Sequence, residues 1–292
     1  MIMTNSAKII DGKLVSADTR KKIAEECREF KEKTGITPGL AVILVGDDNA
    51  SHVYVRNKRR ACEEVGFISK SFELPANTDE ETLLELINQL NADKEIHGIL
   101  LQLPLPQHLN ENKILLSISP QKDVDAFHPL NVGKIMIGNY SFAPCTPRGV
   151  MTLLKYCNID ITGKECVVVG RSNIVGKPQG LLLLAQNGTV TIAHSKTKNL
   201  KEVCLRADIL VVAIGKAKFI TADMIKPGAV VIDVGMNRDS EGKLCGDVDF
   251  ENAIRVASYI TPVPGGVGPM TITTLMENTL RAAKEFVIAN IK

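Results

Sequence analysis

Apolar and polar residues alternate along the first half of this chain in a way that predicts strands and helices in turn. Apolar runs typical of strands cover residues 40–46, 69–75 and 96–104. The stretches before and between them repeat apolar residues with the spacing of an amphipathic helix, at 17–33, 51–65 and 79–92. Strands separated by helices of this length form parallel sheets, so the first half is predicted to be an α/β domain.

The second half contains longer apolar runs, which fit strands covered on both faces of a sheet. These runs lie at residues 166–170, 189–194, 208–215 and 229–235. A break near 141–150 separates the halves, where Thr146 is expected to cap a helix and Pro147 to lie in its first turn. We therefore predict a first domain of residues 1–143 and a second of 144–269, with a terminal helix, 270–292, packing back on the first domain.

Composition agrees with a folded protein of about two domains, at roughly 150 residues per domain. The chain has 292 residues, of which 45% are hydrophobic and 23% are charged. These proportions exclude a mainly disordered or fibrous protein. Lys+Arg number 35 and Asp+Glu 33, so the net charge of +2 argues against a nucleic-acid-binding protein, which needs a basic face.

Several classes of site are not expected from the sequence. No apolar run approaches the ~20 residues that span a bilayer, so we expect no membrane association. The seven cysteines include no CxxC pair and are expected to be reduced thiols of a cytoplasmic protein. The histidines form no HExxH motif and no cluster with zinc-ligand spacing, so no metal site is expected.

The segment CVVVGRSNIVGKP, residues 166–178, predicts a strand, a glycine turn and a helix. Gly170 ends the strand, and the helix follows Gly176. The spacing departs from the usual GxGxxG, but its position between two buried strands is typical of a Rossmann-type dinucleotide-binding domain. An ordinary turn between strand and helix is the alternative.

The end of the next strand indicates which dinucleotide would bind. NAD-binding domains place an acidic residue there for the ribose hydroxyls. This chain has His194, Ser195 and Lys196 instead, with Arg171 in the glycine turn. Hydrogen-bond donors and cations suit a 2′-phosphate, which favours NADP, unless the lysines are only solvated loop charges.

The first domain contains a candidate for acid–base chemistry in the predicted helix 51–65. Tyr54, Val55 and Lys58 would share one helix face, so a flat substrate could stack on the tyrosine beside an ammonium group. We expect the arginines next to Lys58 to lower its pKa by like-charge repulsion. The alternative is a solvated basic face with no chemistry.

Three other segments carry polar or glycine-rich candidates. Gln102 ends an apolar strand, and the carboxyl ends of such strands face ligands in open α/β sheets. Asp123 and Asp125 fall on one side of an extended segment, where they could bind an amino-heterocycle or serve as turn residues. The Pro/Gly loop 262–271 would let backbone approach a ligand, or is only a turn.

Together these motifs resemble the bifunctional methylenetetrahydrofolate dehydrogenase/methenyltetrahydrofolate cyclohydrolase family. The resemblance rests on nine segments whose order and spacing cover nearly the whole chain. They are YVRNK (54–58), LLQLPLP (100–106), KDVDAFHPLNVGK (122–134), PCTPRGV (144–150), VVGRSNIVGKP (168–178), AHSKT (193–197), IDVGMNR (232–238), GDVDF (246–250) and PVPGGVGPMT (262–271).

The resemblance implies two α/β domains flanking a cleft, with folate on the first and NADP on the second, in a cytoplasmic homodimer. It implies NADP-dependent oxidation of 5,10-methylenetetrahydrofolate to the methenyl form and hydrolysis of that product to 10-formyltetrahydrofolate. Some relatives use NAD with bound ions, so NAD stays open. A monofunctional dehydrogenase and a catalytically silent NADP- or folate-binding protein are the alternatives.

By matching motif, the resemblance also implies roles for individual residues. Lys58 is the catalytic lysine, Gln102 bonds to it, Tyr54 stacks on the substrate and Asp125 holds the pterin. The proposed binding residues are Pro264, Gly265 and Gly266 for the substrate, and Gly170, Arg171, Ser172, Ser195, Lys196 and Gly215 for NADP. One position departs from the family pattern, because Ala126 stands where glycine is common and its methyl group could shift Asp125.

Overall fold

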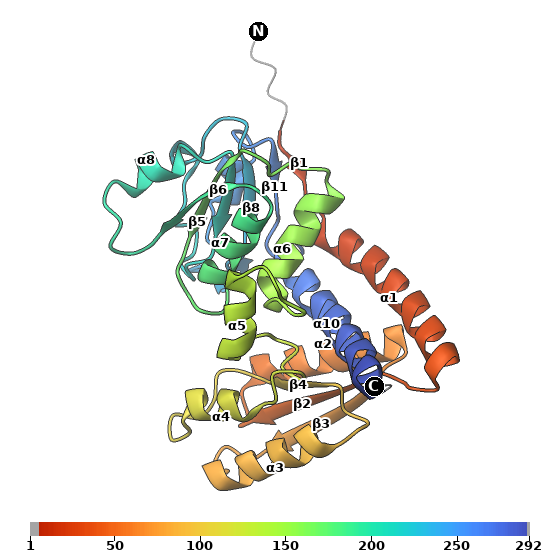
Figure 1. The fold of residues 1–292 in the computed structure, drawn as a ribbon. Helices are drawn as coiled ribbons and strands as arrows, with labels where there is room; N and C mark the ends of the chain where they lie inside the picture. The colour runs from red at the N-terminus through yellow and green to blue at the C-terminus, as the bar shows by residue number, and fades with distance from the viewer. Residues whose placement is uncertain (1–5, 291–292) are drawn as a thin grey trace. The chain divides into compact units, whose positions relative to one another are not determined.

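The computed structural model describes residues 6–290, except for the side chains of 49–51 and 290. The chain forms two compact units, one of residues 17–145 and 272 onward, the other of residues through Ser16 and 146–271. Figure 1 shows the elements of each unit. The boundaries fall inside helices α1 (Gly12–Thr34) and α10 (Val267–Asn290).

The unit of residues 17–145 is built on a three-stranded parallel sheet with strand order β3-β2-β4. Its strands and helices are β2 (Gly39–Val45), α2 (Asn49–Val65), β3 (Ile68–Leu74), α3 (Glu80–Ala92), β4 (Gly98–Leu101), α4 (Glu111–Ser117) and α5 (Pro129–Met136). The three strands and three helices predicted here are confirmed, whereas α4 and α5 were not predicted.

The central strand β2 explains how this sheet is covered on both faces. Its side chains alternate between faces, as a strand requires. Leu40, Val42 and Leu44 join a cluster with apolar residues of α1, α2 and α10. Ala41 and Ile43 face the opposite way and pack with α3 and α4. A continuous apolar run is therefore the expected sequence of a strand buried on both sides.

The other unit contains a six-stranded sheet with order β1-β11-β8-β7-β5-β6 and parallel pairing throughout. Its elements are β1 (Lys8–Ile9), α6 (Cys145–Tyr156), β5 (Glu165–Val169), α7 (Gly176–Ala185), β6 (Thr189–Ala193), α8 (Leu200–Cys204), β7 (Ile209–Val212), the 3₁₀ turn η1 (Ala222–Met224), β8 (Val230–Asp233), β9 (Asn237–Arg238), β10 (Leu244–Cys245), α9 (Phe250–Ala253) and β11 (Tyr259–Ile260). The predicted Rossmann-type parallel sheet is confirmed.

Two details of the predicted organisation differ from the structure. Residues 6–16 group with the unit of residues 146–271 rather than with residues 17–145, because Lys8 and Ile9 pair with β11 at the edge of its sheet. Thr146 lies inside the first turn of α6, which begins at Cys145, so it does not cap the helix from outside. Its hydroxyl is 3.0 Å from that of Thr271.

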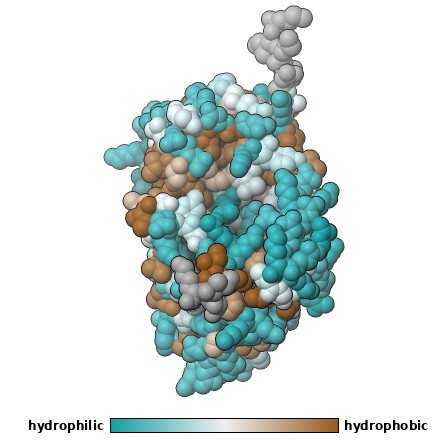
Figure 2. Space-filling view, turned by 45° about the vertical axis from the view of Figure 1, so that its right-hand side comes forward, coloured by the Kyte–Doolittle hydropathy of each residue, from teal (hydrophilic) through white to brown (hydrophobic). Residues whose placement is uncertain are grey.

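Hydrophilic side chains cover much of the face shown in Figure 2. Among the residues described, no helix combines the length and the apolar character that crossing a bilayer requires.

Candidate active site

Lys58 lies in the middle of the buried face of α2. Val55 and Cys62, three residues before and four after it, are 4% and 0% exposed and belong to the apolar core. Lys58 itself is only 8% exposed. A lysine on an apolar stripe has little water for its ammonium group, so it needs a polar partner inside the protein.

That partner is Gln102, whose Oε1 accepts a 2.8 Å hydrogen bond from Lys58 Nζ. Gln102 directly follows β4, and its backbone N–H continues the sheet by donating to the Ile43 carbonyl at 2.8 Å. Its Nε2 donates to the Leu103 carbonyl at 2.7 Å. The amide is thus oriented with its oxygen toward the lysine, and the bond predicted between these two side chains is present.

The sheet topology places both residues at one edge. From β2 the chain passes to β3 on one side, and the third strand, β4, pairs on the other side. The carboxyl ends of β2 and β4 therefore meet at a switch point, which is where open α/β sheets bind ligands. Lys58 comes from the helix after β2, and Gln102 from the segment after β4.

Burial lowers the pKa of the Lys58 ammonium, and the nearby Asp125 carboxylate opposes that shift. The direction agrees with the sequence-based expectation, but the predicted cause was wrong. Arg59 is exposed and points its guanidinium to Glu63, at 3.2 Å, one helical turn along. The pKa of Lys58 is thus lowered because its ammonium group lacks water, and arginine repulsion is not among the causes.

Asp125 is half-buried, close enough to Lys58 for each to influence the other's charge. Burial raises the pKa of its carboxyl, while Lys58 and a hydrogen bond with the Cys145 thiol lower it. Tyr54 is also half-buried, one turn before Lys58 on α2. The structure thus brings Lys58, Gln102 and Asp125 together within one unit, and Tyr54 lies on α2, the helix that carries Lys58.

Asp123 serves a different purpose from Asp125. Its buried carboxylate accepts hydrogen bonds from the backbone N–H groups of Phe127 and His128, at 3.3 and 2.8 Å. It also accepts one from Asn131 Nδ2 at 2.9 Å. Of the two roles left open for this pair, Asp123 has that of a turn residue.

Ala126 adopts the left-handed conformation, with φ of 57°. This region costs a residue with a Cβ about 1–2 kcal/mol relative to its right-handed form, a cost that glycine avoids. The Ala126 methyl is fully buried in the apolar core. The backbone thus follows a glycine-type turn beside Asp125, and the added methyl group packs inward.

The glycine turn after β5 allows two stretches of backbone to approach closely. Gly170 has φ of 137°, and a Cβ there would lie 2.2 Å from the Ala213 carbonyl oxygen after β7. A Cβ on Gly176 would lie 2.2 Å from the Gly170 carbonyl oxygen. Ser172 accepts hydrogen bonds through Oγ from the Val175 and Gly176 N–H groups, at 3.1 and 3.2 Å.

These features surround a second switch point, since β6 and β7 lie on opposite sides of β5. Arg171, Ser195 and Lys196 are exposed at the carboxyl ends of β5 and β6. His194 stabilises the turn that follows β6, where its Nδ1 accepts a hydrogen bond from the Lys196 N–H at 3.2 Å. The arrangement presents a helix N-terminus, two cations and hydroxyl groups, which suits a phosphorylated dinucleotide.

Gly215 lies in a turn that is held by Asp247, a residue that sequence reasoning missed. The buried Asp247 carboxylate accepts hydrogen bonds from the N–H groups of Ile214, Gly215 and Lys216, at 2.6, 3.0 and 2.7 Å. It accepts a fourth from Asn237 Nδ2 at 2.9 Å. Three successive N–H groups around one carboxylate form a nest, so the Gly215 N–H is already occupied by the protein.

We expect Asp247→Ala to destabilise the unit of residues 146–271 by about 2 kcal/mol or more, because it removes a fully buried carboxylate that accepts four partly buried hydrogen bonds. Urea unfolding measures the loss. Asp249→Ala is the matched control, since its carboxylate accepts from exposed Asn252 and its loss should cost under about 1 kcal/mol. Equal stabilities of the two variants would contradict this role of Asp247.

Asp233 supports the same loops from the end of β8. It accepts hydrogen bonds from the N–H groups of Gly235, Asp247 and Val248, at 2.9, 3.0 and 2.9 Å. Burial raises the pKa of Asp233 to about 7, and Asp247 contributes in the same direction. The motifs IDVGMNR and GDVDF thus supply two buried carboxylates that fix the loops beside Gly170 and Gly215.

Residues Pro264, Gly265 and Gly266 form a turn just before α10. Gly265 has φ of 105°, and a Cβ on Gly12 would lie 1.7 Å from the Gly266 carbonyl oxygen. The loop therefore needs glycine to approach α1 closely, within the unit that includes residues 146–271.

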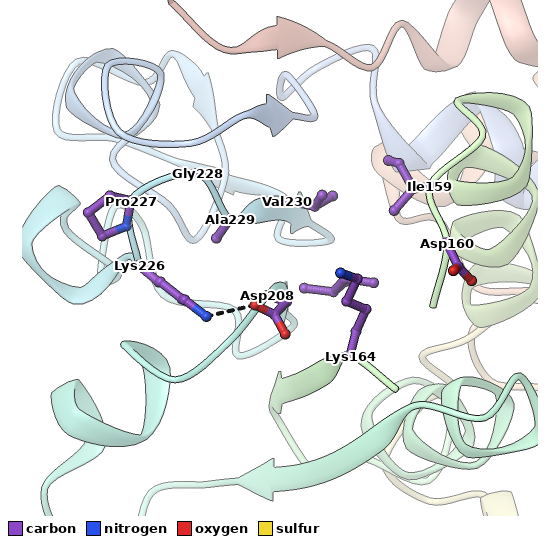
Figure 3. A pocket seen from close by; sticks show the side chains of 10 residues that line it. Ile159, Asp160, Lys164, Asp208, Lys226, Pro227, Gly228, Ala229 and Val230 are labelled. Carbon is purple, nitrogen blue, oxygen red and sulfur yellow. Dashed lines mark hydrogen bonds and ion pairs between the residues drawn. The ribbon is translucent and has the colours of Figure 1, made fainter. Parts of the chain in front are cut away.

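The hollow in Figure 3 lies away from these candidates, at the amino ends of β5, β7 and β8. There Asp208 accepts from Lys226 Nζ at 2.7 Å and from the Glu165 N–H at 3.0 Å. None of the predicted site residues lines it. The Asp208–Lys226 ion pair and the bond to Glu165 connect the segments that lead into these three strands. We therefore interpret the polar residues of this hollow as structural.

Similarity to known proteins covers both units. The family model "Tetrahydrofolate dehydrogenase/cyclohydrolase, catalytic domain" matches residues 10–125, and the NAD(P)-binding domain of the same family matches 144–287. The chain belongs to the tetrahydrofolate dehydrogenase/cyclohydrolase family. The resemblance inferred from the nine segments is confirmed.

Individual members of this family are similar over nearly their full length. The bifunctional protein FolD of Acetivibrio thermocellus is 62% identical over 278 residues, 95% of this chain and 97% of its own length. The crystal structure of the FolD enzyme from Campylobacter jejuni superposes with a TM-score of 0.93, at 50% identity, covering 96% of this chain and 99% of that one. The FolD structure from Trypanosoma brucei, complexed with NADP cofactor and an inhibitor, gives a TM-score of 0.93 at 41% identity, with 97% and 99% covered.

Within the described part of the chain, no group of three or more His, Cys, Asp or Glu side chains is arranged to hold a metal ion.

Proposed function

We infer that this chain is a bifunctional enzyme of one-carbon folate metabolism. It oxidises 5,10-methylenetetrahydrofolate to 5,10-methenyltetrahydrofolate with NADP and hydrolyses that product to 10-formyltetrahydrofolate. The observation that carries this conclusion is the buried Lys58–Gln102 pair beside Asp125. A lysine with a lowered pKa, fixed at the ligand-binding edge of a sheet, is suited to move protons.

We assign the folate-binding roles to residues of the unit that contains Lys58. Tyr54 offers an aromatic face for the flat pterin ring, and Asp125 a carboxylate for its N–H donors. Outside that unit, we assign the turn Pro264–Gly266 to the substrate on the strength of its family motif alone. Lys58 takes and returns the protons of hydrolysis, and Gln102 fixes the direction in which its amine points.

The residues around Gly170 fit NADP. Gly170 leaves room where a Cβ would collide, and the N-terminus of α7 is next to it. No acidic residue stands at the end of β6, where Ser195 and Lys196 are exposed. We assign the dinucleotide phosphates to Gly170, Arg171 and Ser172, and the 2′-phosphate to Arg171, Ser195 and Lys196. When bound, NADP accepts a hydride from the substrate.

The experiment that tests the function supplies purified protein with 5,10-methylenetetrahydrofolate and NADP and follows NADPH by its absorbance. Separate addition of methenyltetrahydrofolate, followed by the loss of its own absorbance, measures hydrolysis. Both signals are expected. NADPH formation without hydrolysis would identify a monofunctional dehydrogenase, and the absence of both would identify a silent binding protein.

Replacing Arg171 by alanine should raise the KM for NADP about ten- to a hundredfold, because a charge-assisted phosphate contact contributes about 1.5–3 kcal/mol. The KM for NAD, which lacks the 2′-phosphate, should change much less. Initial-rate kinetics with both cofactors measure the difference, and Lys198→Ala, an exposed neighbouring lysine, is the control. The same rise for both cofactors would refute the 2′-phosphate assignment.

We further propose that the enzyme is a cytoplasmic homodimer. Strand β3 supports this because it is an edge strand, and the residues described pair only its β2 side. An unpaired edge is suited to pairing with a second copy. Sedimentation of the purified protein tests the proposal, and a mass of one chain at micromolar concentration would contradict it.

A further inference from the structure

The carboxylate of Asp125 lies against a buried thiol for which the proposed reaction has no direct use. Cys145 is 2% exposed and its side chain hydrogen-bonds with that of Asp125. Its Sγ is also 3.5 Å from the Val124 carbonyl oxygen. Burial and the neighbouring Asp125 raise the pKa of the Cys145 thiol well above its usual value. The thiol therefore keeps its single proton, which it shares between the Val124 carbonyl oxygen and the Asp125 carboxylate.

A second buried side chain holds the segments that carry these two groups. Asn278, on α10, is fully buried, and its Nδ2 donates to the carbonyl oxygens of Val124 and Ala143, at 2.7 and 3.1 Å. The same nitrogen is 3.7 Å from Cys145 Sγ. Val124 immediately precedes Asp125, and Ala143 lies two residues before Cys145. One amide thus ties the backbone beside the carboxylate to the backbone beside the thiol.

The orientation of this amide is determined by its surroundings. Among the residues described, Asn278 Oδ1 has no hydrogen-bond partner, whereas Nδ2 faces two carbonyl oxygens. Turning the amide over would place its oxygen against those carbonyls. Asn278 therefore contributes to this network as a donor, and an acidic or apolar residue could not replace it.

Asp125 has reason to need such support. It must stay ionised to accept hydrogen bonds from a pterin, yet burial favours its protonated form. The charged and titratable groups that face it are Lys58 from α2, Cys145 from α6 and Asp123 from its own segment. Lys58 and the thiol proton favour the carboxylate, whereas Asp123 opposes it.

We propose that Cys145 and Asn278 are positioning residues for Asp125. The Cys145 thiol donates to the carboxylate, and the Asn278 amide fixes the backbone from which Asp125 and Cys145 extend. The inference rests on the proposed function, in which Asp125 binds the substrate. It assigns to the C-terminal helix a part in substrate binding, through a residue that does not touch the substrate.

The pH dependence of kcat/KM for 5,10-methylenetetrahydrofolate tests the thiol. Cys145→Ala removes the donor, so the acid limb of the profile should move to higher pH by about half a unit to one unit, the equivalent of one neutral hydrogen bond. Cys145→Ser keeps a donor and should restore the wild-type limb. Cys62→Ala is the control, because it removes another fully buried thiol of the same apolar cluster and should leave the profile unchanged.

The amide is tested by Asn278→Ala. We expect the KM for folate to rise about three- to tenfold in both activities, while the KM for NADP stays at the wild-type value. Thermal unfolding of each variant separates a local effect from loss of the fold. A rise in both KM values together with a lower unfolding midpoint would show that Asn278 serves only the stability of the core, which overturns its positioning role.

Two further outcomes distinguish failure of this inference from failure of the proposed function. If Asp125→Asn impairs both activities but Cys145→Ala keeps the wild-type acid limb, the positioning role of the thiol is wrong and the function stands. If Asp125→Asn leaves the KM for folate unchanged, Asp125 does not bind the substrate, and both the site assignment and this inference fall.

Discussion

Replacing Lys58 by methionine is expected to slow hydrolysis of methenyltetrahydrofolate by about 10²–10⁴-fold while measurable oxidation of methylenetetrahydrofolate remains. Water that attacks the methenyl carbon must lose a proton, and a ring nitrogen must gain one as the ring opens. Lys58 is placed for this transfer, because burial lowers its pKa and Gln102 orients its amine. A hydride carries its own electron pair, so oxidation depends on alignment and needs no protein base in that step.

The measurement follows NADPH and methenyltetrahydrofolate in the same reaction. The variant should accumulate the methenyl product, which the wild-type enzyme consumes. Methionine matches lysine in length and suits the apolar face of α2, so the unfolding midpoint should stay close to that of the wild type. Hydrolysis at the wild-type rate would refute the proton-carrier role. Loss of both activities in a folded variant would make Lys58 a substrate-positioning charge.

Arg59→Met is the matched control for this experiment. It removes a positive charge next to Lys58 in the sequence, but from an exposed side chain that pairs with Glu63. If burial alone lowers the pKa of Lys58, this variant should keep both activities and the wild-type pH dependence. A shifted pH dependence of activity would instead show that repulsion from Arg59 helps to lower the pKa of Lys58, as the sequence suggested.

The contrast between these two residues shows what the sequence could reveal. Lys58 could be found because its motif and its helical phase with Val55 are local properties. Its burial could not, since a basic sequence such as YVRNKRR is equally typical of a solvated helix face. Only the packing of α2 on its sheet separates Lys58 from the exposed arginines on either side.

The strands were predictable for a similar reason. Those buried on both faces are continuous apolar runs, which any window of the sequence displays. Strands β1 and β11 have two residues each and pair across most of the chain, so no local periodicity indicates them. The grouping of residues 6–16 with the unit of residues 146–271 depends on that pairing and was therefore missed.

The supporting residues of the site were missed because their partners are distant in sequence. Asp247 binds the N–H groups of a turn that begins at Ile214, and Asn278 binds carbonyls at Val124 and Ala143. Their motifs, GDVDF and PMTITTLMEN, show polar residues among apolar ones without indicating a target. A buried polar residue requires a partner, but the sequence does not say which.

Asp123 and Asp125, two residues apart, should respond to replacement in opposite ways. Asp125→Ala is expected to lower kcat/KM for folate about ten- to a hundredfold in both activities, because charge-assisted hydrogen bonds contribute about 1.5–3 kcal/mol. The KM for NADP should stay unchanged, since that cofactor is assigned to other residues. Steady-state kinetics of oxidation and hydrolysis measure the effect, and wild-type behaviour in either reaction would make Asp125 a structural residue.

Asp123→Ala should instead reduce stability and leave the catalytic constants of the folded enzyme near those of the wild type. It removes the acceptor of three donors, the N–H groups of Phe127 and His128 and the amide of Asn131. A buried donor without an acceptor costs about 1–3 kcal/mol, and the two backbone donors are only partly buried, so we expect a total loss of about 3 kcal/mol in urea unfolding. Asp125→Ala should reduce the stability less. The side chain of Asp125 is only half-buried, and burial already makes its charged form unfavourable in the folded protein. The pair thus separates binding from folding within one short segment, and equal losses of stability would show that both carboxylates serve the turn.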